Sequence, residues 1–155
     1  MNFPDLFSLE ECNITITRIE KLTNNSQPDW GKMSAAQMFA HLNVAYEFVY
    51  EPEKHRRPTG LKKIFVKLLA KPFVVGPKPY KRSTQTAPEF KAAGELNAQF
   101  DLEKERLIEF LQRVQKDGST KFKHMESHSF GMLTVVEWNT MFSKHLDHHL
   151  TQFRV

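Results

Sequence analysis

Residues 134–152, TVVEWNTMFSKHLDHHLTQ, have the pattern of one amphipathic helix. Thr134, followed three residues later by Glu137, matches a capping box, in which two side chains accept hydrogen bonds from backbone amides that a helix start leaves unpaired. Apolar and histidine side chains then recur on one face; at helical spacing they are Trp138, Phe142, His145, His149 and Gln152. We therefore expect a helix that buries this face in the protein core.

Two further stretches have helical patterns. Ser34 and Gln37 form a second capping box, and Pro52 marks the end of the helix that follows. One face of that helix carries Met38, His41, Ala45 and Phe48. A longer helix is predicted from about Leu96 to Gln115, ending at Asp117-Gly118. Its apolar stripe consists of Leu96, Phe100, Leu107, Phe110 and Val114.

The first segment, from Leu9 to Leu22, fits two structures. Residues 14–18 alternate like a strand, whereas five apolar residues recur at helical spacing: Leu9, Cys12, Ile16, Ile19 and Leu22. We favour a helix, because the rest of the chain offers no partner strand. Four amphipathic helices without a convincing sheet predict an all-α fold, an antiparallel four-helix bundle that forms a single domain over residues 1–155.

The composition is that of an ordinary globular protein. With 155 residues, 40% hydrophobic and 26% charged, the chain is about one domain long and is not a low-complexity sequence. Its one cysteine, Cys12, excludes an internal disulfide framework and fits a packed apolar residue better than a nucleophile. The opening residues lack the apolar core of a secretory signal, and the longest apolar stretch, residues 64–75, is too short to cross a bilayer. We expect a cytoplasmic protein.

Three histidines are candidates for metal ligands. His145 and His149 are four residues apart, so on a helix both rings project from the same side. If their face meets the face of the helix that carries His41, three imidazoles converge and leave a coordination position open. On spacing alone, a histidine on an apolar face is more often a hydrogen-bonded core residue, and His148 is an alternative partner for His145.

The histidine helices resemble a known family. Residues 30–41, WGKMSAAQMFAH, look like the opening of the DinB/YfiT-like proteins, in a branch with a Trp-Gly-Lys-Met start. Residues 133–138, LTVVEW, and 144–153, KHLDHHLTQF, look like the final helix of that branch, and residues 84–90, TQTAPEF, are a weaker match to its middle linker. The resemblance covers the chain from about Leu9 to its end.

This resemblance implies a metalloenzyme fold and a ligand set. It implies a four-helix bundle that holds a divalent metal, usually nickel or zinc, on His41, His145 and His149. Residues 128–131, HSFG, match less well, with Ser129 where a proline is expected, so His128 is assigned no role. Relatives in the superfamily use a low-molecular-weight thiol, which implies metal-assisted S-transfer to a small-molecule substrate. Metal-dependent hydrolysis is the second reaction class.

Two polar residues are candidates for roles beside the metal. Glu103 falls inside an apolar stripe, where a charge is costly unless it is paired. We hypothesise that it faces the metal as a general base or as an acceptor for a ligand imidazole; the alternative is a pairing with a surface Lys or Arg. Gln152 is a candidate to hydrogen-bond a ligand imidazole, or else packs at the edge of the core. Asp147 is expected to point away from the histidine face.

The net charge of +4 is unevenly distributed. From Lys54 to Arg82 there are ten basic residues and no acidic residue, which leaves twelve basic and eighteen acidic residues elsewhere, or −6. Residues 54–90 therefore form a basic insert and linker between the second and third long helices. Within it a short basic amphipathic helix is predicted between Thr59-Gly60 and Pro72. Its apolar side consists of Leu61, Ile64, Phe65, Leu68 and Leu69, with Lys62, Lys63 and Lys67 on the other side.

Three interpretations of this segment compete. We favour a lid whose apolar side packs on the bundle. Its lysines would then lie near the opening of the metal site and attract an anionic thiol or carboxylate substrate. The second is peripheral contact with an anionic membrane surface. Nucleic-acid binding is not expected, because no recognised motif or interleaved stacking aromatics accompany the charge. The competing class is a non-enzymatic binding module with structural histidines, and the chain is expected to be a monomer or a homodimer.

Overall fold

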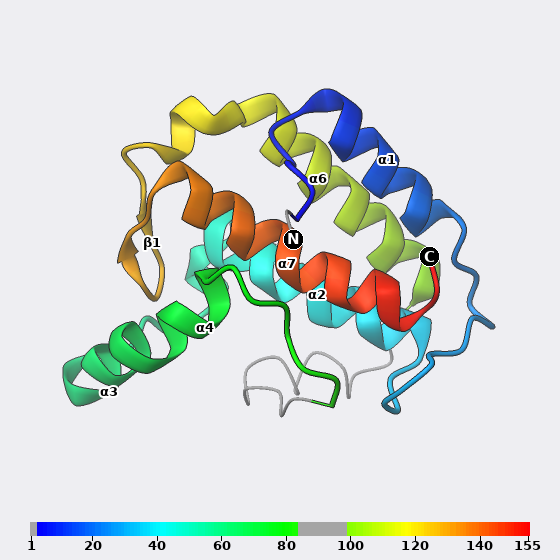
Figure 1. Ribbon diagram of the computed structural model, residues 1–155, viewed down its shortest axis with the longest axis horizontal. Helices are drawn as coiled ribbons and strands as arrows, with labels where there is room; N and C mark the ends of the chain where they lie inside the picture. Colours follow the sequence, from blue (N-terminus) through cyan, green and yellow to red (C-terminus); the bar gives the residue numbers. More distant parts are fainter. Residues whose placement is uncertain (1–2, 84–98) are drawn as a thin grey trace.

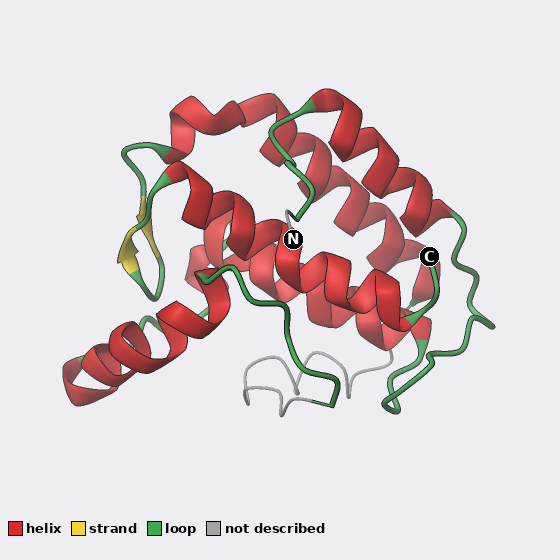
Figure 2. Cartoon of the chain, in the orientation of Figure 1, coloured by secondary structure: helices red, strands yellow, loops and turns green. Residues whose placement is uncertain are grey.

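The computed structural model describes residues 3–83 and 99–155, apart from the side chains of Lys62 and Lys63. These residues are mostly helical, which confirms the all-α class (Figure 2). The long helices are α1 (Leu9–Glu20), α2 (Ala35–Tyr50), α6 (Phe100–Phe122) and α7 (Val135–Gln152). The short elements are η1 (Pro52–Lys54), α3 (Gly60–Phe65), η2 (Val66–Ala70), α4 (Lys71–Val75), β1 (Glu126–Ser127) and β2 (Gly131–Met132).

Both predicted capping boxes are present. The hydroxyl of Ser34 accepts from the amide of Gln37 at 3.2 Å, and the side chain of Gln37 accepts from the amide of Ser34 at 2.9 Å. Thr134 and Glu137 make the same pair of bonds at the start of α7, at 3.2 and 2.8 Å. These bonds satisfy amides that the first turn of a helix leaves unpaired, so each box fixes where its histidine-bearing helix begins.

The core lies between the long helices. Helix α2 packs against both α6 and α7, and α1 packs against α6 (Figure 1). Tyr46 of α2 is buried between two rings, stacking on Phe142 of α7 at 5.5 Å and on Phe110 of α6 at 5.8 Å between centroids. Its hydroxyl donates to the backbone carbonyl of Phe142 at 3.2 Å, so the buried polar tip is satisfied. The apolar faces predicted for α2, α6 and α7 therefore meet in one core.

Helix boundaries follow the predictions with local differences. The first segment is a helix, as favoured. Gly118 interrupts α6 with a φ of +64° where the predicted stop lies, but helical turns resume and continue to Phe122. The predicted start at Leu96 lies outside the described residues. The structure adds one short antiparallel hairpin, β1–β2, in which Glu126 pairs with Met132; two-residue strands are too short to produce an alternating pattern.

The basic segment departs most from expectation. Helix α3, the π-helix η2 and α4 follow one another without a break, so Pro72 does not end the helix. In the wide turn of η2 the amide of Lys71 donates to the carbonyl of Val66, and the next residue, Pro72, sits at the start of α4, where its missing amide hydrogen costs little. None of the described helices is long and apolar enough to span a membrane.

The favoured packing of this segment is wrong for α3 and η2. Helix α3 extends away from the long helices (Figure 1), and the predicted apolar side chains remain 56% to 85% exposed: Leu61, Ile64, Phe65, Leu68 and Leu69. The next element, α4, packs against α7. The segment is therefore attached to the body at one end and exposed at the other.

A buried lysine makes the attachment. Lys144 of α7 is 2% exposed, and its Nζ donates to the carbonyls of Phe73 at 2.6 Å and Gly76 at 3.0 Å. Both carbonyls lie at the C-terminal end of α4, where carbonyls lack helical partners and the helix dipole favours a cation. The ammonium also lies 4.4 Å from the centroid of the Tyr80 ring.

Replacing Lys144 with Met tests this attachment. Methionine keeps most of the buried volume but leaves both carbonyls unpaired, so we expect the free energy of unfolding to fall by about 2 kcal/mol or more. Urea unfolding followed by circular dichroism measures it. Lys116→Met, at an exposed lysine of α6, is the control and should change stability by less than about 0.5 kcal/mol. Equal effects of the two substitutions would show that Lys144 does not hold α4.

Candidate metal centre

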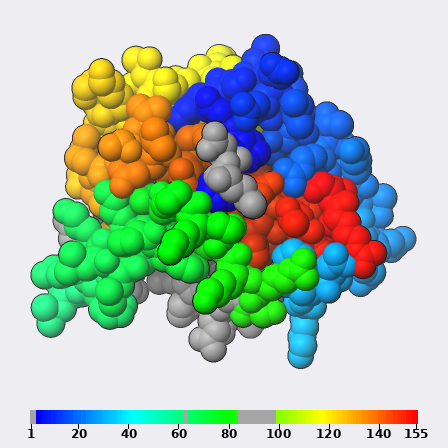
Figure 3. Space-filling model, viewed as in Figure 1, coloured from blue at the N-terminus to red at the C-terminus, as the bar shows by residue number. Residues whose placement is uncertain are grey.

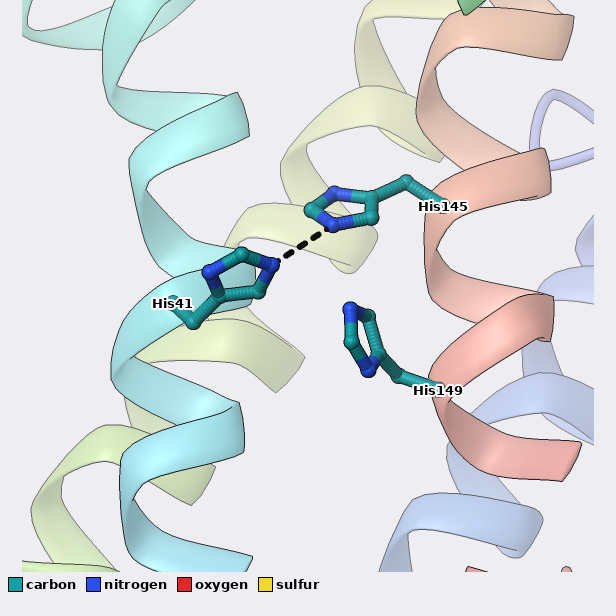
Figure 4. A group of neighbouring side chains, drawn as sticks. All are labelled: His41, His145 and His149. Atoms are coloured by element: carbon teal, nitrogen blue, oxygen red, sulfur yellow. Dashed lines mark hydrogen bonds between the residues drawn. The ribbon is translucent and has the colours of Figure 1, made fainter. Parts of the chain in front are cut away.

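The three predicted histidines converge between α2 and α7. Their ligand nitrogens lie within 4.8 Å of one another, and Nε2 of His41 is 2.8 Å from Nε2 of His145. Each pair of rings is 4.8 to 4.9 Å apart between centroids. Figure 4 shows the ring of His41 facing the two rings that project from successive turns of α7. The arrangement follows from the four-residue spacing of His145 and His149 and from the packing of their face on α2.

Burial keeps the imidazoles of His145 and His149 neutral. His41 is 3% and His149 is 6% exposed. Burial, and then the neighbouring histidine His41, lower the pKa of His149 to about 3. Burial also lowers the pKa of His145 well below its usual value, with the adjacent histidines adding to the effect. A neutral imidazole retains a lone pair that can bind a metal, so His145 and His149 are in the form that a metal needs at neutral pH.

Gln152 fixes the orientation of His149. The side-chain amide of Gln152 donates to the backbone carbonyl of Trp30, which turns its Oε1 toward His149. Nδ1 of His149 must then carry the proton and donates to that oxygen at 2.7 Å. Its Nε2 is consequently the nitrogen with a free lone pair. Gln152 therefore accepts a hydrogen bond from the ring of His149, as expected.

The position next to the hydrogen bond between Gln152 and Trp30 requires a glycine, Gly31. It has a φ of +85°, and a Cβ at this position would lie 2.7 Å from the side-chain nitrogen of Gln152. A side chain would therefore meet both backbone strain and a steric clash. The absence of a Cβ lets the loop before α2 approach α7 closely enough for the carbonyl of Trp30 to accept from Gln152.

Tyr80 covers the group from the side of the basic segment. Its ring lies edge-on to His145 at 6.2 Å and to His148 at 5.7 Å, and stacks on Phe73 at 4.9 Å. Burial raises the pKa of its hydroxyl. The sequence offered no sign of Tyr80 or of Lys144, because neither belongs to a repeating pattern. His148 stays outside the ligand group and contacts Tyr80 and Trp30 instead.

The predicted acids lie elsewhere. Glu103 is not part of the histidine group; its Oε2 accepts a hydrogen bond at 2.7 Å from the buried side chain of Asn43. Its role as a general base stays a prediction. Asp147 points away from the histidines, as expected, and pairs with Arg18 of α1 at 2.8 Å.

His128 belongs to a separate contact region. Its Nε2 lies 3.2 Å from the carbonyl of His55, and its ring stacks on Phe48 at 5.0 Å. His55 in turn pairs with the buried carboxylate of Glu47 at 2.7 Å, and Glu47 also pairs with Arg106. These bonds join the hairpin to the C-terminal end of α2 and account for the burial of His128.

The donor set fits a divalent transition metal. A zinc–imidazole bond is about 2.0 to 2.1 Å long, so nitrogens this close together need only small side-chain movements to share one ion. Neutral imidazoles favour zinc, nickel, copper or iron over magnesium and calcium, which prefer oxygen ligands. The group found among the described residues contains no carboxylate, so the site itself would leave an ion with its positive charge and with positions open to other ligands.

The lowered pKa values predict how stability depends on pH. Unfolded histidine takes up a proton near pH 6.5, whereas folded His149 does so only near pH 3. Between these values the unfolded state binds more protons, so the free energy of unfolding falls as the pH drops, by up to about 1.4 kcal/mol per pH unit for each such histidine. Chelator-treated protein, unfolded in urea from pH 7.5 to 5, measures the slope. His149→Gln should reduce it; a flat profile in the parent protein would contradict the buried neutral state.

The family of the chain is found by comparison with known proteins. Neither a curated protein nor a solved structure matches the chain. A family model described as a protein of unknown function (DUF1569) matches residues 3–155, which include the whole histidine group and the loop at Trp30. Since the match spans nearly the full sequence, the chain belongs to the DUF1569 family.

Proposed function

We propose that the protein is a metal-dependent enzyme that holds one divalent ion, nickel or zinc, on His41, His145 and His149. The convergence of three imidazoles carries this proposal. The bond from His149 to Gln152 supports it further, because metal-binding histidines usually donate their second nitrogen to an oxygen.

The proposal extends to the fold. We propose that α1, α2, α6 and α7 form an antiparallel four-helix bundle of the DinB/YfiT-like type. The order of the long helices supports it, with one histidine on the second and two on the last. The Trp-Gly-Lys-Met start supports it as well, since the carbonyl of Trp30 and the small size of Gly31 serve the bond that orients His149.

For the reaction, we propose S-transfer, in which a low-molecular-weight thiol gives up its proton, its sulfur bonds to an electrophilic carbon of a small substrate, and the leaving group of that carbon departs. A divalent ion at the site would supply Lewis-acid chemistry, stabilising the deprotonated form of a thiol. Hydrolysis would benefit from a base positioned beside the metal. Glu103, the predicted base, is instead hydrogen-bonded to Asn43 and lies outside the histidine group, which favours S-transfer. Gln152 holds the ring of His149 in place, and Tyr80 shields the histidines from water.

Cobalt substitution tests the proposed thiol chemistry. Protein loaded with Co²⁺ should show d–d absorption typical of low coordination, and adding a small thiol should produce a sulfur-to-cobalt charge-transfer band in the near ultraviolet. His145→Ala should lose both signals. A cobalt spectrum that does not respond to millimolar thiol would contradict S-transfer, and the absence of any cobalt spectrum would contradict the metal site.

Replacing Gln152 with Leu tests the orientation of His149. Leucine keeps the buried volume but cannot accept the proton of Nδ1, so zinc affinity should fall about 10- to 100-fold. Competition with a chromophoric chelator measures the affinity. Thr151→Leu, at the exposed neighbouring position, is the control and should leave it unchanged. An unchanged affinity in folded Gln152→Leu protein would show that this hydrogen bond does not support the site.

A further inference from the structure

Helix α3 and the π-helix η2 expose a large apolar surface that the proposed function does not use. Phe65 is 64%, Leu68 is 66% and Leu61 is 85% exposed. Figure 3 shows this segment, in green, as a protrusion at the lower left of the molecule. Isolated exposed apolar residues are common, but a contiguous set on a helix that projects from the body marks an interaction surface.

The same segment is strongly basic. Residues 54–82, which we name the docking arm, contain ten Lys and Arg residues and no acidic residue. Some of the ten contact the body: Lys54 pairs with Glu51, Lys71 pairs with Glu137, and the guanidinium of Arg82 lies 4.3 Å from the centroid of the Trp30 ring. Within the part of the chain that the structure describes, four exposed members of the arm form no ion pair: Arg56, Arg57, Lys67 and Lys78. The arm thus combines uncompensated positive charge with exposed apolar side chains.

We propose that the docking arm binds the surface of an anionic lipid bilayer. An amphipathic helix of this kind lies in the plane of the interface, with its apolar side chains about 5 to 10 Å into the boundary between headgroups and acyl chains. Phe65 and Leu68 would enter that boundary, and basic side chains such as Lys67 would stay at the level of the lipid phosphates. The arm is too short and too charged to cross the bilayer.

An anionic bilayer matches both the positive charge and the exposed apolar side chains of the arm, whereas other partners match only one of these properties. A second copy of the chain could cover the apolar side chains, but pairing two arms would bring together two segments that each contain ten basic and no acidic residues. A nucleic acid would neutralise the charge and leave Leu61, Phe65 and Leu68 in water. Anionic lipid supplies an apolar interior directly beneath a layer of negative charge.

The attachment of the arm links docking to the histidine group. Lys144 holds the C-terminal end of α4 next to His145, and Tyr80, near the end of the arm, lies against the ring of His145. A bilayer bound to α3 and η2 would therefore keep the histidine side of the body close to the membrane. Docking requires no metal, so it stands or falls separately from the proposed reaction.

Vesicle sedimentation tests the proposal. The full chain is mixed with sucrose-loaded vesicles of phosphatidylcholine alone, or of phosphatidylcholine with 30% phosphatidylglycerol, in about 0.1 M salt. We expect binding to the anionic vesicles only, weakening as salt screens the lipid charge. Absence of binding to the anionic vesicles would overturn the proposal. Equal binding to both compositions would overturn it as well. So would a dimer, detected by sedimentation velocity, that does not bind the vesicles.

Matched variants test which residues dock. Leu68→Ser should weaken binding to the anionic vesicles at least fivefold, whereas Leu102→Ser, at an exposed leucine of α6, should not. Lys67→Gln should weaken it about fivefold, and Lys116→Gln, outside the arm, should have less effect. All four sites are exposed, so circular dichroism should show folded protein. If the arm variants and their controls behave alike, the arm does not carry the binding.

Discussion

The packing of α2 against α7 brings three imidazoles into the core, where every polar nitrogen needs a partner. The four-residue spacing of His145 and His149 sets two of them on one side of α7, and the burial of the α2 face presents His41 to them. Burial then keeps the rings of His145 and His149 neutral. The carbonyl of Trp30, through Gln152, selects the tautomer of His149. A chain of contacts from the loop before α2 to the end of α7 thus orients His149, the proposed metal ligand.

The attachment of the basic insert also depends on α7. Lys144, one residue before His145, satisfies two carbonyls at the end of α4 and so joins the arm to the body. Beyond that attachment, the arm makes its apolar side chains available to an outside surface. The overall charge of +4 therefore combines an acidic body with a basic arm. The two parts have different chemistry: the body brings three histidines together in its core, and the arm presents positive charge.

Features with a local pattern were predictable from the sequence. The capping boxes at Ser34 and Thr134 and the spacing of His145 and His149 are set by interactions within one or two helical turns, so a reading of the sequence finds them. The exposure of Phe65 and its neighbours was not predictable, since an amphipathic pattern reveals an apolar face and not what covers it. The contacts of Lys144 and Tyr80 were not predictable either, because they involve residues distant in the sequence.

The metal content of the protein tests the central claim most directly. Protein purified without a polyhistidine tag or a nickel column, then incubated with zinc or nickel and dialysed, is analysed by inductively coupled plasma mass spectrometry. The convergence of His41, His145 and His149 predicts about one equivalent of metal per chain, and much less in His41→Ala protein that remains folded. Less than about half an equivalent in the parent protein, or an equal content in the variant, would contradict the account.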